Sequence, residues 1–335
     1  MRPTELKRLI SQRIKAGIRR PTHIESSPGI GKTQIAAQIA RELGLAFRCI
    51  HAPLMQAEDY GFPVISADRD NVSFVVCRDK FPLQSDKQCP ESGILLIDEL
   101  PQTDASGQKI LANLLQEREI HGQAIKDGWT IITTGNRTQD RSGANRILSH
   151  LKNRITTVEL DVSIDDWVNW AIEHGVNSEV AAFARFRPNL LNDFDPSREI
   201  NPTPRAWVEG VSAALGKIEP SLEFAAFKGD VGEGAAAEFC AFLKVYRHLP
   251  SLESIVASPM SASVPDDPAT KYATVGMLSH NATSDNFAAL VSYVSRMTPE
   301  FVVMFMNTAT RRDGRLCLTQ AFSQWARTSG ASVLT

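Results

Sequence analysis

The spacing of apolar residues at the start of the chain is helical. The apolar positions are Leu6, Leu9, Ile10, Ile14 and Ile18, and basic side chains fill many of the positions between them. This pattern predicts an amphipathic helix that packs its apolar stripe on the following domain. Contact with a membrane or with nucleic acid is the alternative for a basic helix of this kind.

Short β-rich runs then alternate with helical segments as far as residue 160. The predicted strands are residues 22–25, 46–51, 94–98, 130–134 and 155–160, and helices are expected at 32–43 and 106–116. Strands separated by helices predict an α/β fold with a doubly wound parallel sheet. Such sheets bind ligands at the carboxyl ends of their strands. Two candidate hairpins interrupt the pattern, at residues 60–80 and at 119–126, and the second turns at His121-Gly122.

Beyond residue 162 the predicted strands end and the pattern becomes helical. Proline-marked stretches at 187–204 and 257–270 are expected to connect helices. Six residues recur at roughly helical spacing, a pattern that is more typical of a core than of a binding stripe. They are Phe224, Phe227, Phe239, Phe242, Val245 and Tyr246. The length of 335 residues suits two domains, or one domain with a large annex.

Composition and charge narrow the class of protein only a little. The chain has 36 Lys and Arg against 38 Asp and Glu, which gives no sign of a polyanionic partner. No apolar run reaches the roughly 20 residues that cross a bilayer, and the charged first residues do not fit a signal peptide, so a cytoplasmic protein is expected. The five cysteines are scattered, with no CxxC pair and no histidine grouping that indicates zinc. We expect reduced thiols.

Residues 26–33 read Ser-Ser-Pro-Gly-Ile-Gly-Lys-Thr, between a predicted strand and a predicted helix. They match the phosphate-binding pattern GxxxxGK[ST], except that Ser26 replaces the first glycine. The pattern therefore does not settle which backbone conformation the chain adopts at residue 26. In such loops backbone N–H groups and a lysine hold phosphate oxygens, and a Thr hydroxyl binds Mg²⁺. A simple turn is the alternative. The residues expected to hold the nucleotide are Ser27, Pro28, Gly29, Ile30, Gly31, Lys32, Thr33 and Gln34.

Polar residues at the ends of two further predicted strands complete a hydrolytic site. Asp98 can hold Mg²⁺ together with Thr33, and Glu99 can orient and polarise the attacking water. An acidic helix cap is the alternative for this pair. Asn136 follows the next strand, where its amide could reach the γ-phosphate, although asparagine also forms turns. The sequence has neither the Asn-Lys-x-Asp of a GTPase nor the LSGGQ-type helix of a transporter ATPase.

Six segments in this order resemble the AAA+ ATPases, and more narrowly their MoxR-type branch, which includes the CbbQ and NorQ proteins. The segments are residues 27–33, Ala-Glu-Asp-Tyr-Gly-Phe-Pro at 57–63, Ile-Asp-Glu-Leu at 97–100, Leu-Leu-Gln-Glu-Arg-Glu at 114–119, Thr-Gly-Asn-Arg at 134–137 and Leu-Lys-Asn-Arg at 151–154. The resemblance spans residues 20–215 and implies an ATP-driven ring, usually a hexamer, with each nucleotide held between subunits. It also implies a protein partner, often one with a von Willebrand A domain.

The resemblance assigns roles to three arginines. Arg154 matches the finger that reaches the neighbouring subunit's nucleotide, and Arg146 is a weaker candidate for a second such contact. Arg205 matches the sensor-2 arginine of the helical lid, at a helix start marked by Thr203 and Pro204. For each arginine, an ion pair with a nearby carboxylate is the alternative. The carboxylates considered for Arg205 are those of Asp193 and Asp195.

We therefore expect an AAA+ core with an N-terminal helix and two inserted hairpins at residues 1–160, a helical lid at 161–217 and a helical extension at 218–335. The hairpins would face the pore or a substrate, with Phe62, Phe74, His121 and Lys126 as candidate contacts, although packing or solvation is the more ordinary interpretation. The expected function is an ATP-hydrolysing ring motor that remodels a protein. A DNA-directed motor and a nucleotide-gated scaffold with little turnover are the alternatives.

Overall fold

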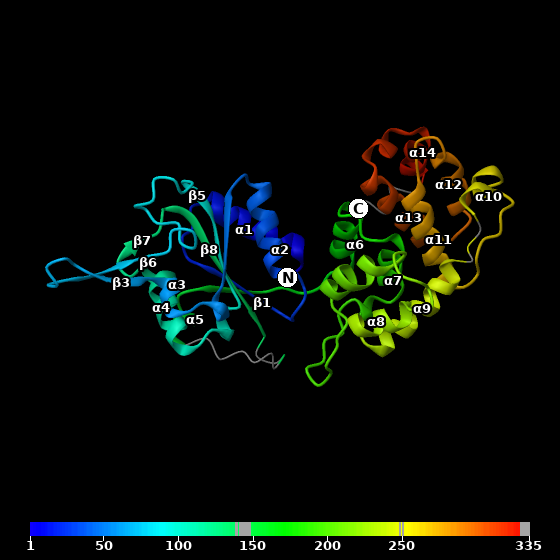
Figure 1. Ribbon diagram of the computed structural model, residues 1–335. Coiled ribbons are helices and arrows are strands. Elements are labelled where there is room, and N and C mark those ends of the chain that lie inside the picture. Colours follow the sequence, from blue (N-terminus) through cyan, green and yellow to red (C-terminus); the bar gives the residue numbers. More distant parts are fainter. Residues whose placement is uncertain (138–139, 141–148, 248, 250, 329–335) are drawn as a thin grey trace. The chain divides into compact units, whose positions relative to one another are not determined.

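The computed structural model describes residues 1–137, 140, 149–247, 249 and 251–328 (Figure 1). These residues form two compact units. Unit 1 contains residues 1–162 and 194–197, and unit 2 contains the described residues of 163–193 and 198–335. Apart from residues 161–162 and 194–197, the lid and the extension expected from the sequence belong to unit 2. Their division after residue 217 stays a prediction.

Unit 1 is built on a five-stranded parallel sheet with the strand order β2-β5-β8-β1-β9. The strands are β1 (Thr22–Ser26), β2 (Ala46–His51), β5 (Ser92–Asp98), β8 (Gly128–Asn136) and β9 (Thr156–Glu159). The doubly wound parallel sheet predicted from the sequence is confirmed, with small shifts at the strand ends.

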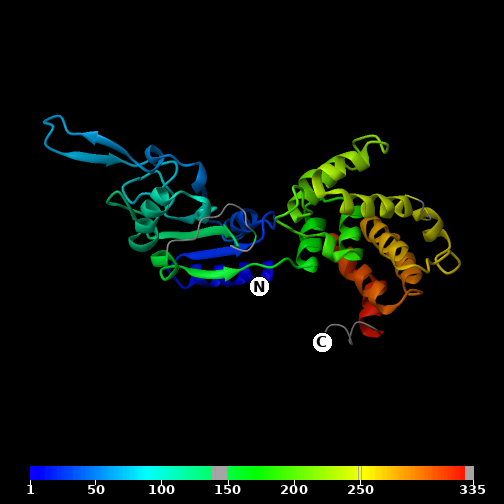
Figure 2. The same ribbon diagram turned by 90° about the horizontal axis from the view of Figure 1, so that it is seen from below.

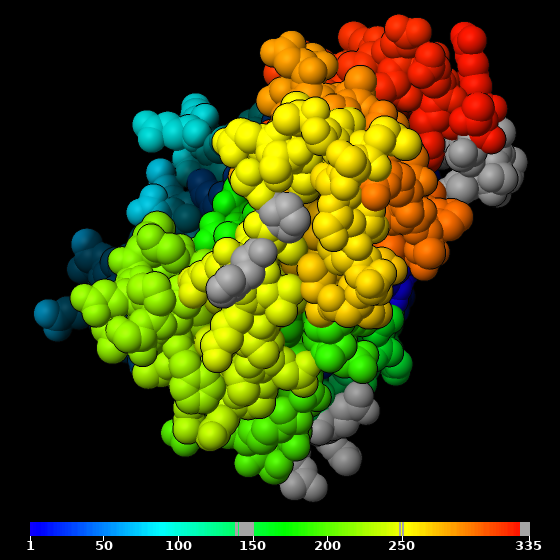
Figure 3. All heavy atoms as spheres, turned by 90° about the vertical axis from the view of Figure 1, so that its right-hand side faces the viewer, coloured from blue at the N-terminus to red at the C-terminus, as the bar shows by residue number. Residues whose placement is uncertain are grey.

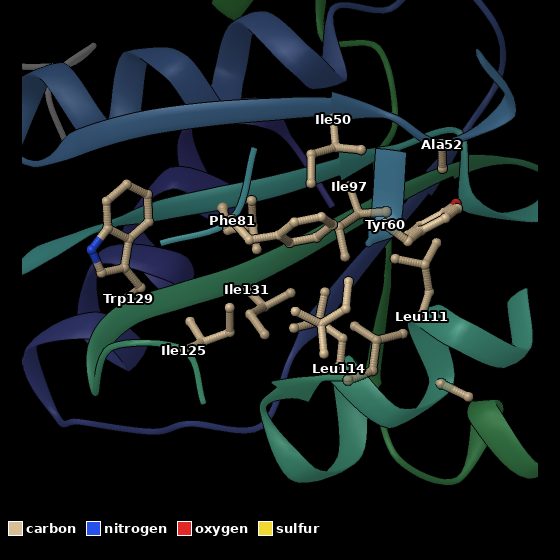
Figure 4. Packing of buried hydrophobic residues seen from close by; sticks show 14 of the residues in the cluster. Ile50, Ala52, Tyr60, Phe81, Ile97, Leu111, Leu114, Ile125, Trp129 and Ile131 are labelled. Carbon is tan, nitrogen blue, oxygen red and sulfur yellow. The ribbon is translucent and has the colours of Figure 1, made fainter. Parts of the chain in front are cut away.

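Helices cover both faces of this sheet, because successive residues of a strand point to opposite sides. Ile94 and Leu96 of β5 pack in one cluster with α1 (Pro3–Lys15) and α2 (Lys32–Glu42). Leu95 and Ile97 pack in the other cluster with α4 (Ala105–Glu117). Figure 4 shows this second cluster, in which the side chains of the sheet meet those of α4.

The N-terminal helix docks on unit 1 as its apolar pattern predicts. Leu6 and Ile10 of α1 are 0% and 1% exposed and belong to the cluster on the α2 face of the sheet. Leu9 and Ile14 are partly buried, whereas Ile18 lies beyond the end of α1 and is 42% exposed. The predicted docking is therefore confirmed for the helix itself but not for Ile18.

Both hairpins expected from the sequence are present. β3 (Phe62–Ile65) pairs antiparallel with β4 (Val72–Val75), and every residue of both strands is exposed. This hairpin projects away from the sheet (Figures 1 and 2). β6 (Glu119–Ile120) and β7 (Gln123–Ala124) form the second hairpin. Its turn residues His121 and Gly122 have φ angles of 46° and 75°, as a two-residue type I′ turn requires.

The four candidate contacts of the hairpins have different surroundings. The ring of Phe74 stacks on that of His121 with centroids 4.2 Å apart, so these two residues pack against each other. Lys126 is buried and forms an ion pair with Glu91. Phe62 is 58% exposed. Of the four, Phe62 therefore has the most open side chain.

The remaining elements of unit 1 are short: η1 (Ala52–Leu54), α3 (Ala57–Tyr60), η2 (Leu100–Gln102) and α5 (Ser149–Lys152). The described residues of unit 2 are helical and include no strand. Its elements are α6 (Ile164–Glu173), α7 (Ser178–Phe186), η4 (Pro188–Leu190), the π-helix η5 (Ala206–Ser212), α8 (Glu223–Val231), α9 (Glu233–Tyr246), α10 (Leu252–Ala257), α11 (Pro268–Asn281), α12 (Phe287–Val294), α13 (Pro299–Arg312), η6 (Gly314–Leu318) and α14 (Gln320–Thr328).

Unit 2 has an aromatic core and an aliphatic-rich core. Phe183, Trp207 and Phe239 contact one another with ring centroids 5.1–5.4 Å apart. Phe227 and Phe242 are also buried, which confirms the core interpretation for these residues. It is wrong for Phe224, whose side chain is 41% exposed. A second cluster joins α10 to α14. Figure 3 shows one face of this unit, where the segments from α8 to α11 run from green-yellow to orange.

None of the helices described in either unit has the length and apolar character of a membrane span.

Candidate functional site

The carboxyl ends of three strands bring predicted site residues together. Ser26 ends β1, Asp98 ends β5 and Asn136 ends β8. Ser26 and Asn136 are also partners in the register of β1 and β8. Since β8 lies between β5 and β1, the three residues share one edge of the sheet.

The loop from β1 to α2 has the backbone of a phosphate-binding loop. Gly29 and Gly31 have φ angles of 74° and 100°, which cost glycine little and other residues much more. Gly31 is the N-cap of α2, so the helix begins at Lys32. The first N–H groups of a helix lack carbonyl partners within it, and they favour an anion at this end. Pro28, Ile30 and Thr33 are partly exposed and Gln34 is exposed.

Ser26 does not disturb this loop. It lies in the strand β1 and is not among the described residues with positive φ, so the missing glycine causes no strain there. Its hydroxyl instead accepts a hydrogen bond from the Nζ atom of Lys32 at 2.9 Å.

Lys32 is held among neutral oxygens. It is 8% exposed, and its Nζ donates to Ser26 Oγ and to Asn136 Oδ1 at 2.9 Å each, and to the Ser27 carbonyl oxygen at 3.3 Å. The structure thus places Asn136 beside the lysine of the loop. A phosphate would be a stronger acceptor than these groups, because its negative charge attracts the ammonium group of Lys32 in addition to accepting its hydrogen bonds.

Both carboxylate oxygens of Asp98 have hydroxyl partners. Thr33 Oγ1 donates to Oδ2 at 2.9 Å, and Thr134 Oγ1 donates to Oδ1. The same Thr134 hydroxyl accepts from the backbone N–H of Glu99 at 3.0 Å. A hydroxyl and a carboxylate at this distance are hard oxygen donors, so Thr33 and Asp98 fit the ligand preference of Mg²⁺.

Glu99 has a left-handed backbone conformation, with φ 58° and ψ 38°. For a residue other than glycine this conformation costs about 1–3 kcal/mol and is found most often at functional sites. Its side chain is partly buried, and its carboxylate forms no hydrogen bond or ion pair with the residues that the structure describes. Glu99 therefore presents an uncompensated carboxylate beside Asp98.

Two side chains on β2 extend this edge of the sheet. His51 is the register partner of Asp98, and its Nδ1 lies 3.4 Å from Asp98 Oδ2. The Sγ atom of Cys49 lies 3.9 Å from Nε2 of His51. Burial, with a smaller contribution from the charge of Asp98, raises the pKa of Cys49 to about 11.

The expectation that no cysteine lies in a histidine grouping is therefore wrong for Cys49. Cys49 and His51 face the same side of β2 because they are two residues apart. The third member, Asp98, comes from a neighbouring strand, so spacing along the chain does not reveal the group.

Sequence reasoning also missed Arg137, which follows Asn136. Its guanidinium forms an ion pair with Glu159 at 2.7 Å and donates to Ser27 Oγ at 3.2 Å. Its backbone N–H donates to the Ser26 carbonyl oxygen at 3.3 Å. Arg137 thus ties the phosphate-binding loop to β9. The only signal in the sequence is its place directly after Asn136.

Arg154 lies between α5 and β9. It is partly buried, and its guanidinium has no ion pair or hydrogen bond with the part of unit 1 that the structure describes. The alternative of a carboxylate partner in the same chain therefore has no support among these residues. Arg146 lies outside the described residues.

Arg205 lies at the helix start that the sequence predicts, in unit 2. The N–H of Ala206 donates to Thr203 Oγ1 at 3.2 Å, which confirms Thr203 as a cap. The Nε atom of Arg205 lies 4.0 Å from Oε2 of Glu209, one turn later, so an ion pair with a carboxylate is present, although with Glu209. The side chain of Arg205 is 52% exposed. The two aspartates considered from the sequence have other partners, since Asp193 pairs with Arg198 and Asp195 accepts from Ser197.

Residues 24–158 match the family model described as "ATPase family associated with various cellular activities (AAA)". The match runs from β1 into β9 and includes the whole edge that carries Lys32, Asp98 and Asn136. It covers less than half of the chain, and it shows an AAA domain with the P-loop NTPase fold.

No curated protein is similar enough to the chain to count as a match. Among solved structures, a proposed ATPase from Cytophaga hutchinsonii is 15% identical, with 92% of this chain and 79% of that chain covered and a TM-score of 0.36. Two variants of RuvB from Thermotoga maritima are 17% and 16% identical, each with a TM-score of 0.40. Their alignments cover 76% and 77% of this chain, and 75% and 76% of the RuvB chains.

Proposed function

We propose that this chain, whose residues 24–158 form an AAA domain, is an ATP-hydrolysing motor of the MoxR-like kind. It would assemble as a hexameric ring and remodel a protein partner. The observation that carries the proposal is the meeting of Lys32, Asp98 and Asn136 at one edge of the sheet, with Glu99 next to Asp98.

Each side chain of this edge has a role that its geometry supports. Lys32 would exchange its neutral oxygen partners for the β- and γ-phosphate oxygens of ATP, at the N-terminus of α2. Thr33 and Asp98 would hold Mg²⁺, which supplies positive charge to those oxygens. Glu99 would orient the attacking water and accept its proton, since no described residue occupies its carboxylate.

Asn136 and two arginines would complete the site. Asn136, beside Lys32, is placed to contact the γ-phosphate or the attacking water. Arg154 would reach the nucleotide of a neighbouring subunit, and a finger of this kind contributes about 10³–10⁵ in rate. Arg205 would act as a sensor of bound nucleotide, because a cation at a helix N-terminus is favoured by a nearby anion.

An exposed apolar surface supports a protein as the substrate. Phe62, Ile65, Val72 and Val75 of the β3–β4 hairpin are 58%, 64%, 54% and 59% exposed. Phe62 pairs with Val75 and Ile65 pairs with Val72, so the two pairs lie on opposite faces of the hairpin. Exposed apolar side chains on both faces favour protein contacts, whereas nucleic acid is bound by clustered Lys and Arg. By resemblance to its family, a protein with a von Willebrand A domain is the partner to try first.

The substitution Glu99→Gln tests this function. We expect the variant to bind ATP as the wild type does and to lose turnover by about 10²–10⁴-fold, the usual contribution of a general base. Binding of a fluorescent ATP analogue and release of phosphate measure the two properties. Glu117→Gln, at the exposed end of α4, is the matched control.

Unchanged turnover in Glu99→Gln would remove the proposed water-activating role of Glu99. Turnover of the wild type is also measured with and without double-stranded DNA at two salt concentrations. Strong stimulation that disappears at the higher salt concentration would favour a DNA-directed motor over protein remodelling.

A further inference from the structure

Cys49, His51 and Asp98 form a group of possible metal ligands. The three ligand atoms, a thiol sulfur, an imidazole nitrogen and a carboxylate oxygen, all lie within 4.8 Å of one another. Cys49 and His51 come from β2, and Asp98 is the register partner of His51 on β5. The parallel pairing of β2 and β5 therefore fixes the backbone of all three residues.

We propose that these three side chains bind Zn²⁺. Sulfur and imidazole ligands select borderline-soft cations such as Zn²⁺, whereas Mg²⁺ prefers oxygen. Tetrahedral zinc with bonds of about 2.0–2.3 Å places its ligand atoms roughly 3.3–3.6 Å apart. The 3.4 Å separation joins His51 Nδ1 to Asp98 Oδ2, whereas the 3.9 Å separation joins Cys49 Sγ to His51 Nε2. With a single nitrogen of His51 as the ligand atom, the three ligand atoms lie within 4.8 Å of one another.

Small side-chain movements are enough to close this site. The His51 side chain is 56% exposed, so its ring has room to rotate toward the cation. Cys49 packs at the edge of the α1–α2 cluster, which keeps the thiol on this side of the sheet. Water would occupy the fourth position. Binding replaces the thiol proton, which passes to solvent, and no electron is transferred.

The zinc ligands include an oxygen that the nucleotide site also needs. Oδ2 of Asp98 faces His51 and accepts the hydroxyl of Thr33. A cation bound by Cys49 and His51 would draw this oxygen away from Thr33, so Zn²⁺ and the magnesium nucleotide would exclude each other. This consequence rests on the proposed function, whereas the binding of zinc itself does not.

Titration of the reduced, nucleotide-free full chain with Co²⁺ tests the binding. Co²⁺ takes the same ligands as Zn²⁺, and its bond to a thiolate gives a charge-transfer band in the near ultraviolet. We expect the band to saturate with one Co²⁺ per chain and to disappear when Zn²⁺ is added. Cys49→Ser should lose the band. His51→Gln should weaken binding by at least about 10–100-fold, because the loss of even an outer-shell partner of a ligand costs that much.

Cys77→Ser and Cys240→Ser are the matched controls, since both thiols are partly exposed and lie outside the group. Both controls should keep the band. A band that survives in Cys49→Ser, or no band in the wild type, would overturn the proposed site.

A second measurement tests the consequence for ATP hydrolysis. The ratio of turnover with and without micromolar Zn²⁺ is compared between the wild type and Cys49→Ser. We expect zinc to inhibit the wild type at least tenfold and to leave the ratio for Cys49→Ser near one. Equal inhibition of both proteins would overturn the mutual exclusion. If neither protein hydrolyses ATP, the proposed function fails, while the Co²⁺ titration still decides the metal site.

Discussion

Two threonine hydroxyls determine the position of Asp98, the residue on which both proposed metal sites depend. Thr33 and Thr134 donate to different oxygens of the carboxylate. Thr134 in addition accepts from the N–H of Glu99, whose left-handed backbone is otherwise unfavourable. Thr134 is therefore a positioning residue, which acts on the reaction through Asp98 and Glu99.

The isosteric change Thr134→Val removes this hydroxyl. We expect kcat for ATP hydrolysis to fall by about 10–100-fold with a smaller change in KM, the usual effect of losing a partner of a metal ligand. Thr134→Ser should restore most of kcat because it keeps the hydroxyl. Steady-state phosphate release measures both constants.

Thr130→Val is the control, since Thr130 lies on the same strand but pairs with Ile94 of β5, away from Asp98. A wild-type kcat in Thr134→Val, or no recovery in Thr134→Ser, would contradict the positioning role.

At the scale of elements, the docking of α1 and the packing of the two hairpins are the features that side-chain substitutions can test. α1 contributes two fully buried side chains to the core of unit 1. The β6–β7 hairpin contacts β4 through the stacked rings of Phe74 and His121. The docking of α1 is apolar, whereas the stack of Phe74 on His121 contains an imidazole ring that can be protonated.

Ile10→Ala tests the docking of α1. Truncation of a buried isoleucine should lower the free energy of unfolding of unit 1 by about 2–5 kcal/mol. Ile18→Ala, at a side chain that is 42% exposed, should change it by no more than about 0.5 kcal/mol. Hydrogen exchange of amides in β1 and α2 measures the stability of unit 1 separately from unit 2. Equal effects of the two substitutions would contradict the docked helix.

The stacked ring of His121 should respond to pH. Burial lowers its pKa below the ordinary value of 6.5, and its Nε2 is buried without a hydrogen-bond partner among the described residues. Because the folded protein favours the neutral ring, the contribution of His121 to stability is present above pH 6.5 and is lost as pH falls through the lower, folded-state pKa.

An NMR titration measures this pKa directly. We expect His121 to titrate below 6.5, and we expect Phe74→Ala, which uncovers the ring, to move its pKa toward 6.5. Ile65→Ala, at an exposed position of the same hairpin, should leave the pKa where it was. A pKa in the wild type at or above 6.5 would contradict the burial of this ring.

At the scale of the whole molecule, the sequence was sufficient to predict the sheet and most of the candidate site. Asp98 and Asn136 end buried strands and Lys32 follows the loop after another, and parallel strands bring such positions to one edge. The pairing of β2 with β5 could not be predicted in the same way, because nothing in the spacing of Cys49 and His51 specifies which residue of the neighbouring strand lies beside them.

The helical unit was less predictable for a similar reason. Its residues show helical spacing, but the contacts among Phe183, Trp207 and Phe239 join three separate segments, and helical periodicity does not specify which helices meet. The cap at Thr203 was predictable because it depends on adjacent residues alone.

Among the residues that the structure describes, none forms an ion pair or hydrogen bond with the guanidinium of Arg154. This arginine gives the proposed ring its most direct test. Lys32→Ala subunits lack a working phosphate loop but keep the finger, and Arg154→Ala subunits have the opposite defect. Each variant alone should have little turnover. In an equal mixture, half of the sites keep Lys32 and half of their neighbours supply Arg154, so about a quarter of wild-type turnover should return in a head-to-tail ring.

The measurement is ATP turnover as a function of the mixing ratio of the two variants. The control mixes Arg154→Ala with the double variant Lys32→Ala, Arg154→Ala, which supplies no finger and should restore nothing. A maximum near equal proportions is the result that the shared site predicts. No recovery at any ratio, with subunits shown to exchange, would contradict a site completed by the neighbouring subunit.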